Sequence, residues 1–406
     1  MSSRALRPVV PLLVLIIAGC LIAAVGNGIR TSFGLFTLPM SADLGLSREG
    51  WGMAMAIQNL VWGVAQPFAG AWADRYGTGR VLAGGAVIYT LGVVLMAFSP
   101  TASTLMVTAG IITGVGIAVS SFSVVMVAFG RAVPNEKRSL IFGIATAASS
   151  FGQFAFAPIS QGFINAFGWQ TALMWLAAML LLIVPLSFAL RGKSEAPATG
   201  EADLPFMEAL STAWGYGSYR LLVIGFFVCG FHIAFINVHM PAYLVECGLP
   251  PESGGWAIAI IGLFNIVGSL LSGYLGGRLP KQLLLAGIYF LRAIAIGLFL
   301  LFPVSELTAY TFGAVMGLLW LSTVPLTAGL VSMFFGPRYM GLLYGVAFFS
   351  HQLGSFTGIW LGGFAYDHTG SYALVWYLGI ILGLASAAIH LPINERRDLK
   401  FAPQAA

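Results

Sequence analysis

The sequence predicts an all-α membrane protein with twelve transmembrane helices in two six-helix pseudo-repeats. The first observation is composition: 58% of the 406 residues are hydrophobic and only 8% are charged, and the mean hydropathy is +0.90. Soluble domains contain about 25% charged residues, so no soluble core could bury this much apolar surface. The second is that the apolar residues form long continuous runs, which excludes the alternating strands of a β-barrel. The third is a motif that occurs twice.

Twelve apolar segments are each long enough to cross a bilayer as a helix, which takes about 20 residues. In chain order they lie at residues 9–38, 50–73, 80–99, 104–130, 139–166, 169–190, 221–245, 254–277, 281–303, 307–334, 340–365 and 372–393. The polar stretch at 191–220 separates the two sets of six and predicts a linker, with a short amphipathic helix near 206–214. We therefore expect an N-terminal bundle at 1–190, a cytoplasmic linker at 191–220 and a C-terminal bundle at 221–406.

The motif that occurs twice follows the second and eighth segments. Residues 70–80 read Gly-Ala-Trp-Ala-Asp-Arg-Tyr-Gly-Thr-Gly-Arg, and a degraded copy begins at Gly273. Gly70 corresponds to Gly273 and Arg75 to Arg278, and the fifth and eleventh segments pair Gly152 with Gly354 at almost the same offset. Pairs at a nearly constant offset in distant regions predict a parallel repeat of six helices.

The distribution of Lys and Arg predicts the orientation in the membrane. Placing the N-terminus in the cytoplasm puts 16 of the 19 Lys and Arg residues on the cytoplasmic side, as the positive-inside rule requires. We expect a multi-pass protein of the cell (inner) membrane with both termini in the cytoplasm. The net charge of +5 then reflects topology, and we expect no nucleic-acid partner.

The loop motif resembles that of the major facilitator superfamily, and this resemblance covers the whole chain. It implies alternating access, with Asp74, Arg75, Arg80 and Arg278 in gating roles that link helices on the cytoplasmic side. The alternative is an ordinary positive-inside cluster of charges.

A narrower resemblance, to monocarboxylate porters and oxalate–formate antiporters, rests on residues 30–36 (Arg-Thr-Ser-Phe-Gly-Leu-Phe), 349–354 (Phe-Ser-His-Gln-Leu-Gly) and 366–372 (Tyr-Asp-His-Thr-Gly-Ser-Tyr). The sequence departs from both groups. Ser269 stands where the anion-binding arginine of the eighth segment is common, and His351 where the oxalate–formate group has a lysine.

Charged residues inside the spans are few and all positive. A charge near the bilayer centre costs at least ~2.5–3.5 kcal/mol, yet the first span contains Arg30 and the ninth contains Arg292, while none of the 14 acidic residues falls inside a span. Arg30 shares a helix face with Asn27, and its guanidinium could hold a carboxylate bidentately; the alternative is a structural pair with an acid of an outer loop. For Arg292 we favour a structural role on neighbouring carbonyls, and a place in the site is the alternative.

Four further polar residues inside the spans are candidate substrate ligands: His232, His239, Asn265 and His351. Each also has a structural interpretation, because polar groups in membrane helices commonly hydrogen-bond between helices. His351 is the strongest of the three histidines, and we expect it to oppose Arg30 across the two halves. If protons are coupled to transport, a histidine is the expected carrier, since no span holds an acid.

Nucleotide-binding loops, paired carboxylates, metal-ligand clusters and nucleophilic triads do not occur in the sequence, and its three cysteines are isolated. We therefore expect no enzyme, no cofactor and no metal. The sequence favours a monomeric secondary transporter of small organic anions, most of all monocarboxylates, by proton symport or anion exchange. A drug or sugar carrier of the same fold is the alternative, although cation exporters and proton–sugar symporters commonly use a buried carboxylate. A receptor or a membrane enzyme is a third, weaker hypothesis.

Overall fold

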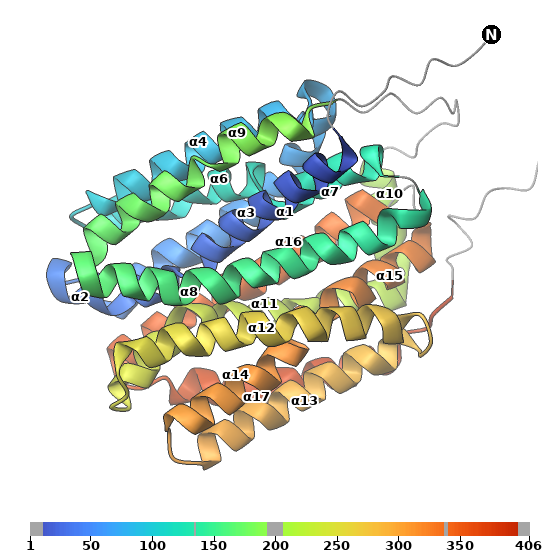
Figure 1. Ribbon diagram of the computed structural model, residues 1–406. Helices are drawn as coiled ribbons and strands as arrows, with labels where there is room; N and C mark the ends of the chain where they lie inside the picture. Colours follow the sequence, from blue (N-terminus) through green and yellow to red (C-terminus); the bar gives the residue numbers. More distant parts are fainter. Residues whose placement is uncertain (1–10, 134, 193–205, 337–339, 397–406) are drawn as a thin grey trace, which may run out of the picture.

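The structure is a computed structural model that describes residues 11–133, 135–192, 206–336 and 340–396. Most of the linker, at residues 193–205, and the side chain of Asp74 lie outside the described part. Within this part, the regular secondary structure is helical. Figure 1 shows long helices lying side by side, with the blue-to-green helices on one side of the molecule and the yellow-to-red helices on the other.

The first group, here called the N-terminal helices, precedes the linker. Its elements are α1 (Leu12–Thr31), η1 (Phe33–Phe36), α2 (Thr37–Leu44), α3 (Arg48–Tyr76), α4 (Thr78–Ala97), α5 (Ala102–Leu105), η2 (Met106–Ile112), α6 (Thr113–Val119), α7 (Phe122–Ala132), α8 (Asn135–Leu180), α9 (Ile183–Ser187) and η3 (Phe188–Leu190).

The second group, here called the C-terminal helices, follows a short helix that continues the linker, α10 (Phe206–Gly215). Its elements are α11 (Gly217–Glu246), α12 (Pro251–Gly276), α13 (Lys281–Leu301), α14 (Glu306–Leu319), α15 (Thr323–Phe335), α16 (Met340–Thr369) and α17 (Ala373–His390). The short helix expected near 206–214 corresponds to α10.

The all-helical, twelve-span fold is confirmed. Nine helical stretches of the described chain are long and apolar enough to cross a membrane. One of them, Ile141–Leu190, contains two predicted segments, which meet at Gly168. Gly168 has a φ of +77°, a conformation that residues with a Cβ rarely adopt, so the chain turns sharply there. The remaining two predicted segments, the second and the eleventh, each form a single helix: α3 with 29 residues and α16 with 30.

The helix starts follow ordinary capping chemistry. The Ser47 hydroxyl accepts a hydrogen bond from the Gly50 amide at the start of α3, and Ser305 with Thr308 forms a capping box at the start of α14. The first, fourth, sixth and tenth predicted segments are each interrupted. The break between α14 and α15 frees backbone groups that other side chains then bind.

Equivalent contacts recur within each group of helices. A Cβ added to Gly152 of α8 would overlap the carbonyl oxygen of Ala24 in α1, and a Cβ added to Gly354 of α16 would overlap the carbonyl oxygen of Phe227 in α11. Glycine is therefore needed at both positions so that the two backbones can approach. The two contacts lie about 200 residues apart in the sequence, at the offset that the repeated motif predicts.

One end of the bundle shows a similar correspondence between the two groups of helices. At one end, here called the Thr78 end, the Thr78 amide that begins α4 donates to the Gly192 carbonyl at 3.2 Å. In the C-terminal helices the Gln282 amide at the start of α13 donates to the Glu395 carboxylate at 2.9 Å, which also pairs with Lys281 at 3.9 Å. The opposite end, here called the Arg48 end, holds Asp43, Arg48, Glu246, Glu252 and Asp367.

Candidate functional site

Arg30 lies in the last turn of α1 and has no carboxylate partner in the described part of the chain. Its Nη2 donates to the Asn27 Oδ1 at 3.2 Å, and its Nε is buried without a hydrogen-bond partner. Asn27 is held in turn, because its Nδ2 donates to the Ser149 carbonyl of α8 at 3.2 Å. The alternative pairing with an outer acid does not occur: Asp43 accepts from Trp169, and Glu49 accepts from Trp360.

The guanidinium of Arg30 lies over the ring of Trp62, 4.8 Å from its centroid. Trp62 is fixed by its indole nitrogen, which donates to the Gln66 Oε1 at 2.8 Å, and Gln66 donates to the Ser121 hydroxyl at 3.1 Å. Three helices of the N-terminal group, α1, α3 and α7 with its N-cap Ser121, therefore hold a cation over an aromatic face. Such a contact stabilises the guanidinium without neutralising its charge.

Aromatic rings continue from Trp62 into the C-terminal helices. Phe348 of α16 packs edge-on against Trp62 with ring centroids 5.3 Å apart, and it stacks on His351 at 5.8 Å. The ring of Phe226 in α11 also packs against His351, tilted, with ring centroids 4.9 Å apart. Arg30 and His351 thus belong to opposite groups of helices, and the rings of Trp62 and Phe348 lie between them.

His351 is 8% exposed and its Nδ1 lies 3.0 Å from the Oε1 of Gln352. Gln352 is fully buried, and its Nε2 donates to the Asn59 carbonyl of α3 at 3.0 Å. A candidate ligand of the C-terminal helices is therefore hydrogen-bonded to a residue that contacts the N-terminal helices directly.

The other two candidate histidines bind backbone carbonyls within the C-terminal helices. Nε2 of His232 lies 2.8 Å from the Gly379 carbonyl of α17, and Nε2 of His239 lies 2.8 Å from the Ile359 carbonyl of α16. Each must donate there, because a carbonyl only accepts. Their seven-residue spacing places His232 and His239 on one face of α11, yet the two rings bind different helices. This geometry favours the structural interpretation.

Asn265 and Arg292 both bind the backbone at the break between α14 and α15. The Asn265 Oδ1 accepts from the Leu321 amide at 3.0 Å, while its Nδ2 donates across to Ser150 of α8 at 2.9 Å. Arg292 is 0% exposed, and its Nη2 donates to the carbonyls of Leu319 and Trp320. Asn265 links the two groups of helices with both its oxygen and its nitrogen hydrogen-bonded, and Arg292 contacts the freed carbonyls as a structural residue would.

The three arginines expected to gate, Arg75, Arg80 and Arg278, are exposed at the Thr78 end. Arg75 lies against Tyr76, its neighbour in α3, Arg278 lies against Tyr274 in the last turn of α12, and Arg80 is exposed. Within the described residues the ion pairs are Arg48–Glu246 and Lys281–Glu395, so these three arginines do not link helices in this conformation.

The two groups of helices pack tightly at the Arg48 end. The Asp367 carboxylate of α16 accepts from the backbone amide of Arg48 at 3.0 Å, and the Arg48 Nη2 pairs with Glu246 of α11 at 3.0 Å. On the other side of the interface, Asn165 of α8 donates to Glu252 of α12 at 2.6 Å. This end is closed.

Toward the Thr78 end, α3 and α16 separate. Gly63 packs against Gln352, since a Cβ added to Gly63 would lie 2.8 Å from the Cβ of Gln352. Gly70 and Gly345 lie seven residues further on the same faces of the two helices, yet no atom lies within 4 Å of a Cβ added to either. The site around Arg30 and Trp62 is therefore next to the point where these two helices begin to diverge.

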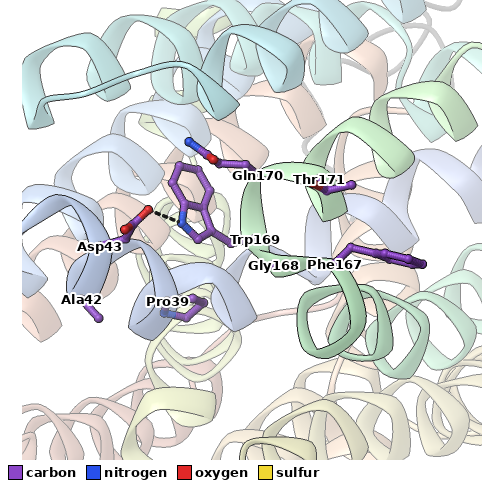
Figure 2. A pocket seen from close by; sticks show the side chains of 8 residues that line it. All are labelled: Pro39, Ala42, Asp43, Phe167, Gly168, Trp169, Gln170 and Thr171. Atoms are coloured by element: carbon purple, nitrogen blue, oxygen red, sulfur yellow. Dashed lines mark hydrogen bonds between the residues drawn. The ribbon is translucent and has the colours of Figure 1, made fainter.

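A separate cavity of about 490 Å³ lies at the Arg48 end between α2 and α8. Figure 2 shows its lining, in which Asp43 points toward Trp169 and accepts a hydrogen bond from the indole nitrogen at 2.9 Å. Gly168 forms the turn beside it. Its lining comes from the N-terminal helices alone and includes none of the candidate site residues.

The contribution of Gln352 and Phe348 was not predicted from the sequence. Gln352 stands next to His351 in an apolar helix, and a buried amide needs hydrogen-bond partners, so its presence was a usable signal. Nothing in the sequence shows that its partner is a backbone carbonyl of α3.

Comparison with known proteins places this geometry in context. The sequence profile described as Major Facilitator Superfamily matches residues 15–359. The chain is 27% identical over 384 residues to the uncharacterized MFS-type transporter YcxA of Bacillus subtilis, covering 92% of this chain and 93% of that protein. It is 25% identical over 375 residues to monocarboxylate transporter 13 of Bos taurus, covering 89% and 84% of the two chains.

Among solved structures, the chain is similar to a bacterial homologue of the human lysosomal transporter Spinster, crystallised in an inward-facing and unoccupied conformation. The TM-score is 0.70 with 14% sequence identity, and the alignment covers 93% of this chain and 94% of that one. At this identity the similarity concerns the fold.

Proposed function

Because this chain belongs to the major facilitator superfamily, we propose that it is a secondary transporter of small organic anions, with monocarboxylates as the substrate class. Its relatives include transporters named for monocarboxylates. The observation that carries the proposal is Arg30, a guanidinium within a membrane span that no carboxylate neutralises in the described chain. A carboxylate bound beside Trp62 would supply the missing negative charge.

The proposed mechanism is alternating access between the N-terminal bundle (1–190) and the C-terminal bundle (221–406). The positive-inside rule puts the Thr78 end in the cytoplasm, together with both termini. The closed Arg48 end then faces outward, and the substrate enters or leaves along the diverging α3 and α16. Asp74, Arg75, Arg80 and Arg278 gate the Thr78 end when it closes. The protein acts as a monomer in the inner membrane.

Anion binding rests on Arg30 and Asn27 of α1, with His351 as the ligand from the opposite bundle. The rings of Trp62 and Phe348 would pack against the apolar part of the substrate. Proton coupling, where it occurs, would use His351, since the spans contain no acid. His232, His239 and Asn265 support the C-terminal bundle and its contact with α8.

The test is uptake of labelled lactate, pyruvate, formate and oxalate into proteoliposomes, with and without an inward proton gradient. We expect saturable uptake of at least one monocarboxylate. Stimulation by the gradient indicates proton symport, and stimulation by internal unlabelled anion indicates exchange. Saturable uptake of a neutral sugar or a cationic drug, with none of these anions transported, would overturn the proposal in favour of the other carrier classes.

A further inference from the structure

Gln352 is a fully buried side chain of α16 that contacts α3. Its Nε2 donates to the Asn59 carbonyl at 3.0 Å, and its Cβ lies against Gly63. Beyond this level the two helices separate toward the Thr78 end. Gln352 is therefore at the edge of the closed part of the interface.

The hydrogen-bond geometry fixes the orientation of the Gln352 amide. The Asn59 carbonyl can only accept, so the amide nitrogen must face α3 and the Oε1 must face His351. The Oε1 also accepts a longer hydrogen bond from Ser355 at 3.4 Å. Because Oε1 is an acceptor, the Nδ1 of His351, 3.0 Å away, must carry a proton and donate.

We propose that Gln352 is a positioning residue that couples ligand binding at His351 to the contact between α3 and α16. This inference rests on the proposed function, in which His351 contacts the anion. An imidazole that turns its Nδ1–H toward a bound anion withdraws that donor from the Oε1 of Gln352. The buried amide then loses a partner, which weakens the closed interface and favours opening at the Arg48 end.

The other described side chains around His351 form no hydrogen bond to the N-terminal helices, although Phe348 packs against Trp62. Phe226 and Phe348 pack against its ring, and the nearby thiol of Cys229 belongs to α11 and bonds with Thr323 of α15 at 3.1 Å. These groups lie in the C-terminal helices. Gln352 is the His351 neighbour that reaches the N-terminal helices by a hydrogen bond.

The experiment measures the conformational populations of the full-length protein in nanodiscs. Spin labels are placed through non-natural amino acids at Ala42 and Leu307, which are both exposed, lie at the Arg48 end and belong to opposite groups. The native cysteines are thereby retained. The fraction of molecules in which the two groups of helices are separated at the Arg48 end, here called the separated fraction, is measured without ligand and with saturating lactate or pyruvate. Anion affinity is measured in a second experiment.

The test variant is Gln352→Met, which keeps the side-chain volume and removes the three hydrogen bonds of the amide. The matched control is Gln58→Met: Gln58 of α3 is buried and donates to the Ala109 carbonyl at 2.8 Å, within the N-terminal helices. We expect Gln352→Met to raise the ligand-free ratio of separated to closed molecules at least about tenfold. We also expect it to abolish the further shift caused by the anion, with affinity within about threefold of wild type. The control should behave as wild type.

A second variant keeps the inference testable if Gln352→Met does not fold. Gly63→Ala places a methyl against the Cβ of Gln352 and should raise the separated fraction in the same direction. Unchanged populations in both variants would overturn the inference and leave the proposed function standing. A loss of affinity as large as that of an Arg30 variant would also overturn it, because Gln352 would then be a ligand. If wild type binds no tested anion, the proposed function fails, and with it the coupling to His351.

Discussion

The carboxylate of Asp367 accepts a hydrogen bond of 2.7 Å from the backbone amide of Glu49. Asp367 lies near the end of α16 and Glu49 in the first turn of α3, so a C-terminal helix caps the start of an N-terminal one. The first amides of a helix have no partner within it, and a negative charge at that position is favourable. The Asp367 carboxylate is thus one of the contacts that close the Arg48 end of the molecule.

The first prediction concerns this contact. Asp367→Asn removes the charge and leaves a single side-chain oxygen to accept the two backbone amides. The separated fraction at the Arg48 end should therefore rise, by roughly three- to tenfold for a loss of ~1 kcal/mol. The distance between labels at Ala42 and Leu307 measures it. Asp43→Asn is the matched control, since Asp43 bonds with Trp169 inside the N-terminal helices. Equal effects of the two variants would contradict the role of Asp367.

The second prediction concerns Arg30. Losing a hydrogen-bonded charge partner costs ~2–5 kcal/mol, so Arg30→Gln should weaken monocarboxylate binding at least ~30-fold. A neutral methyl ester of the same acid should be little affected. Binding to purified protein is measured for both compounds, and Arg220→Gln, an exposed arginine at the start of α11, is the control for lost charge. Equal losses for the acid and its ester would show that Arg30 holds helices and does not bind the anion.

The third prediction concerns Arg292. Arg292→Met keeps an unbranched apolar stem and leaves the carbonyls of Leu319 and Trp320 without their donor. Hydrogen bonds to charged groups contribute ~1.5–3 kcal/mol, so we expect a lower melting temperature with nearly normal anion affinity in the surviving protein. Thermal unfolding in detergent and ligand binding are the two measurements. A stable variant that no longer binds anion would place Arg292 in the site.

The fourth prediction compares two glycines of α16. Gly354→Ala forces a methyl into the Phe227 backbone and should destabilise the protein by ~1–3 kcal/mol or more. Gly345→Ala meets no atom within 4 Å and should leave thermal stability unchanged. Gly345 faces the side on which α3 would close, however. The added methyl should therefore lower the transport rate of Gly345→Ala while its anion affinity is retained. Melting temperature and transport rate are measured for both variants. Normal turnover of Gly345→Ala would argue against closure of α3 on α16 at the Thr78 end.

The sequence by itself determined the twelve spans and the charges inside them. Composition alone requires lipid as the surroundings, and a helix that crosses lipid must satisfy its own backbone, so length and hydropathy suffice to find the helices. The turn at Gly168 was also predictable, because the fifth and sixth segments meet there. The lack of an acid to pair with Arg30 could be recognised because the sequence places every acidic residue outside the spans.

Only the tertiary structure decided which polar side chains meet. Helical spacing puts His232 and His239 on one face, but their ring nitrogens bind carbonyls of two different helices, α17 and α16. Spacing likewise gives no partner for Gln352, whose contact is a main-chain oxygen almost 300 residues away in the sequence. Periodicity fixes a direction around one helix axis. The neighbour found in that direction depends on how all the helices pack, and a backbone acceptor leaves no mark in the sequence.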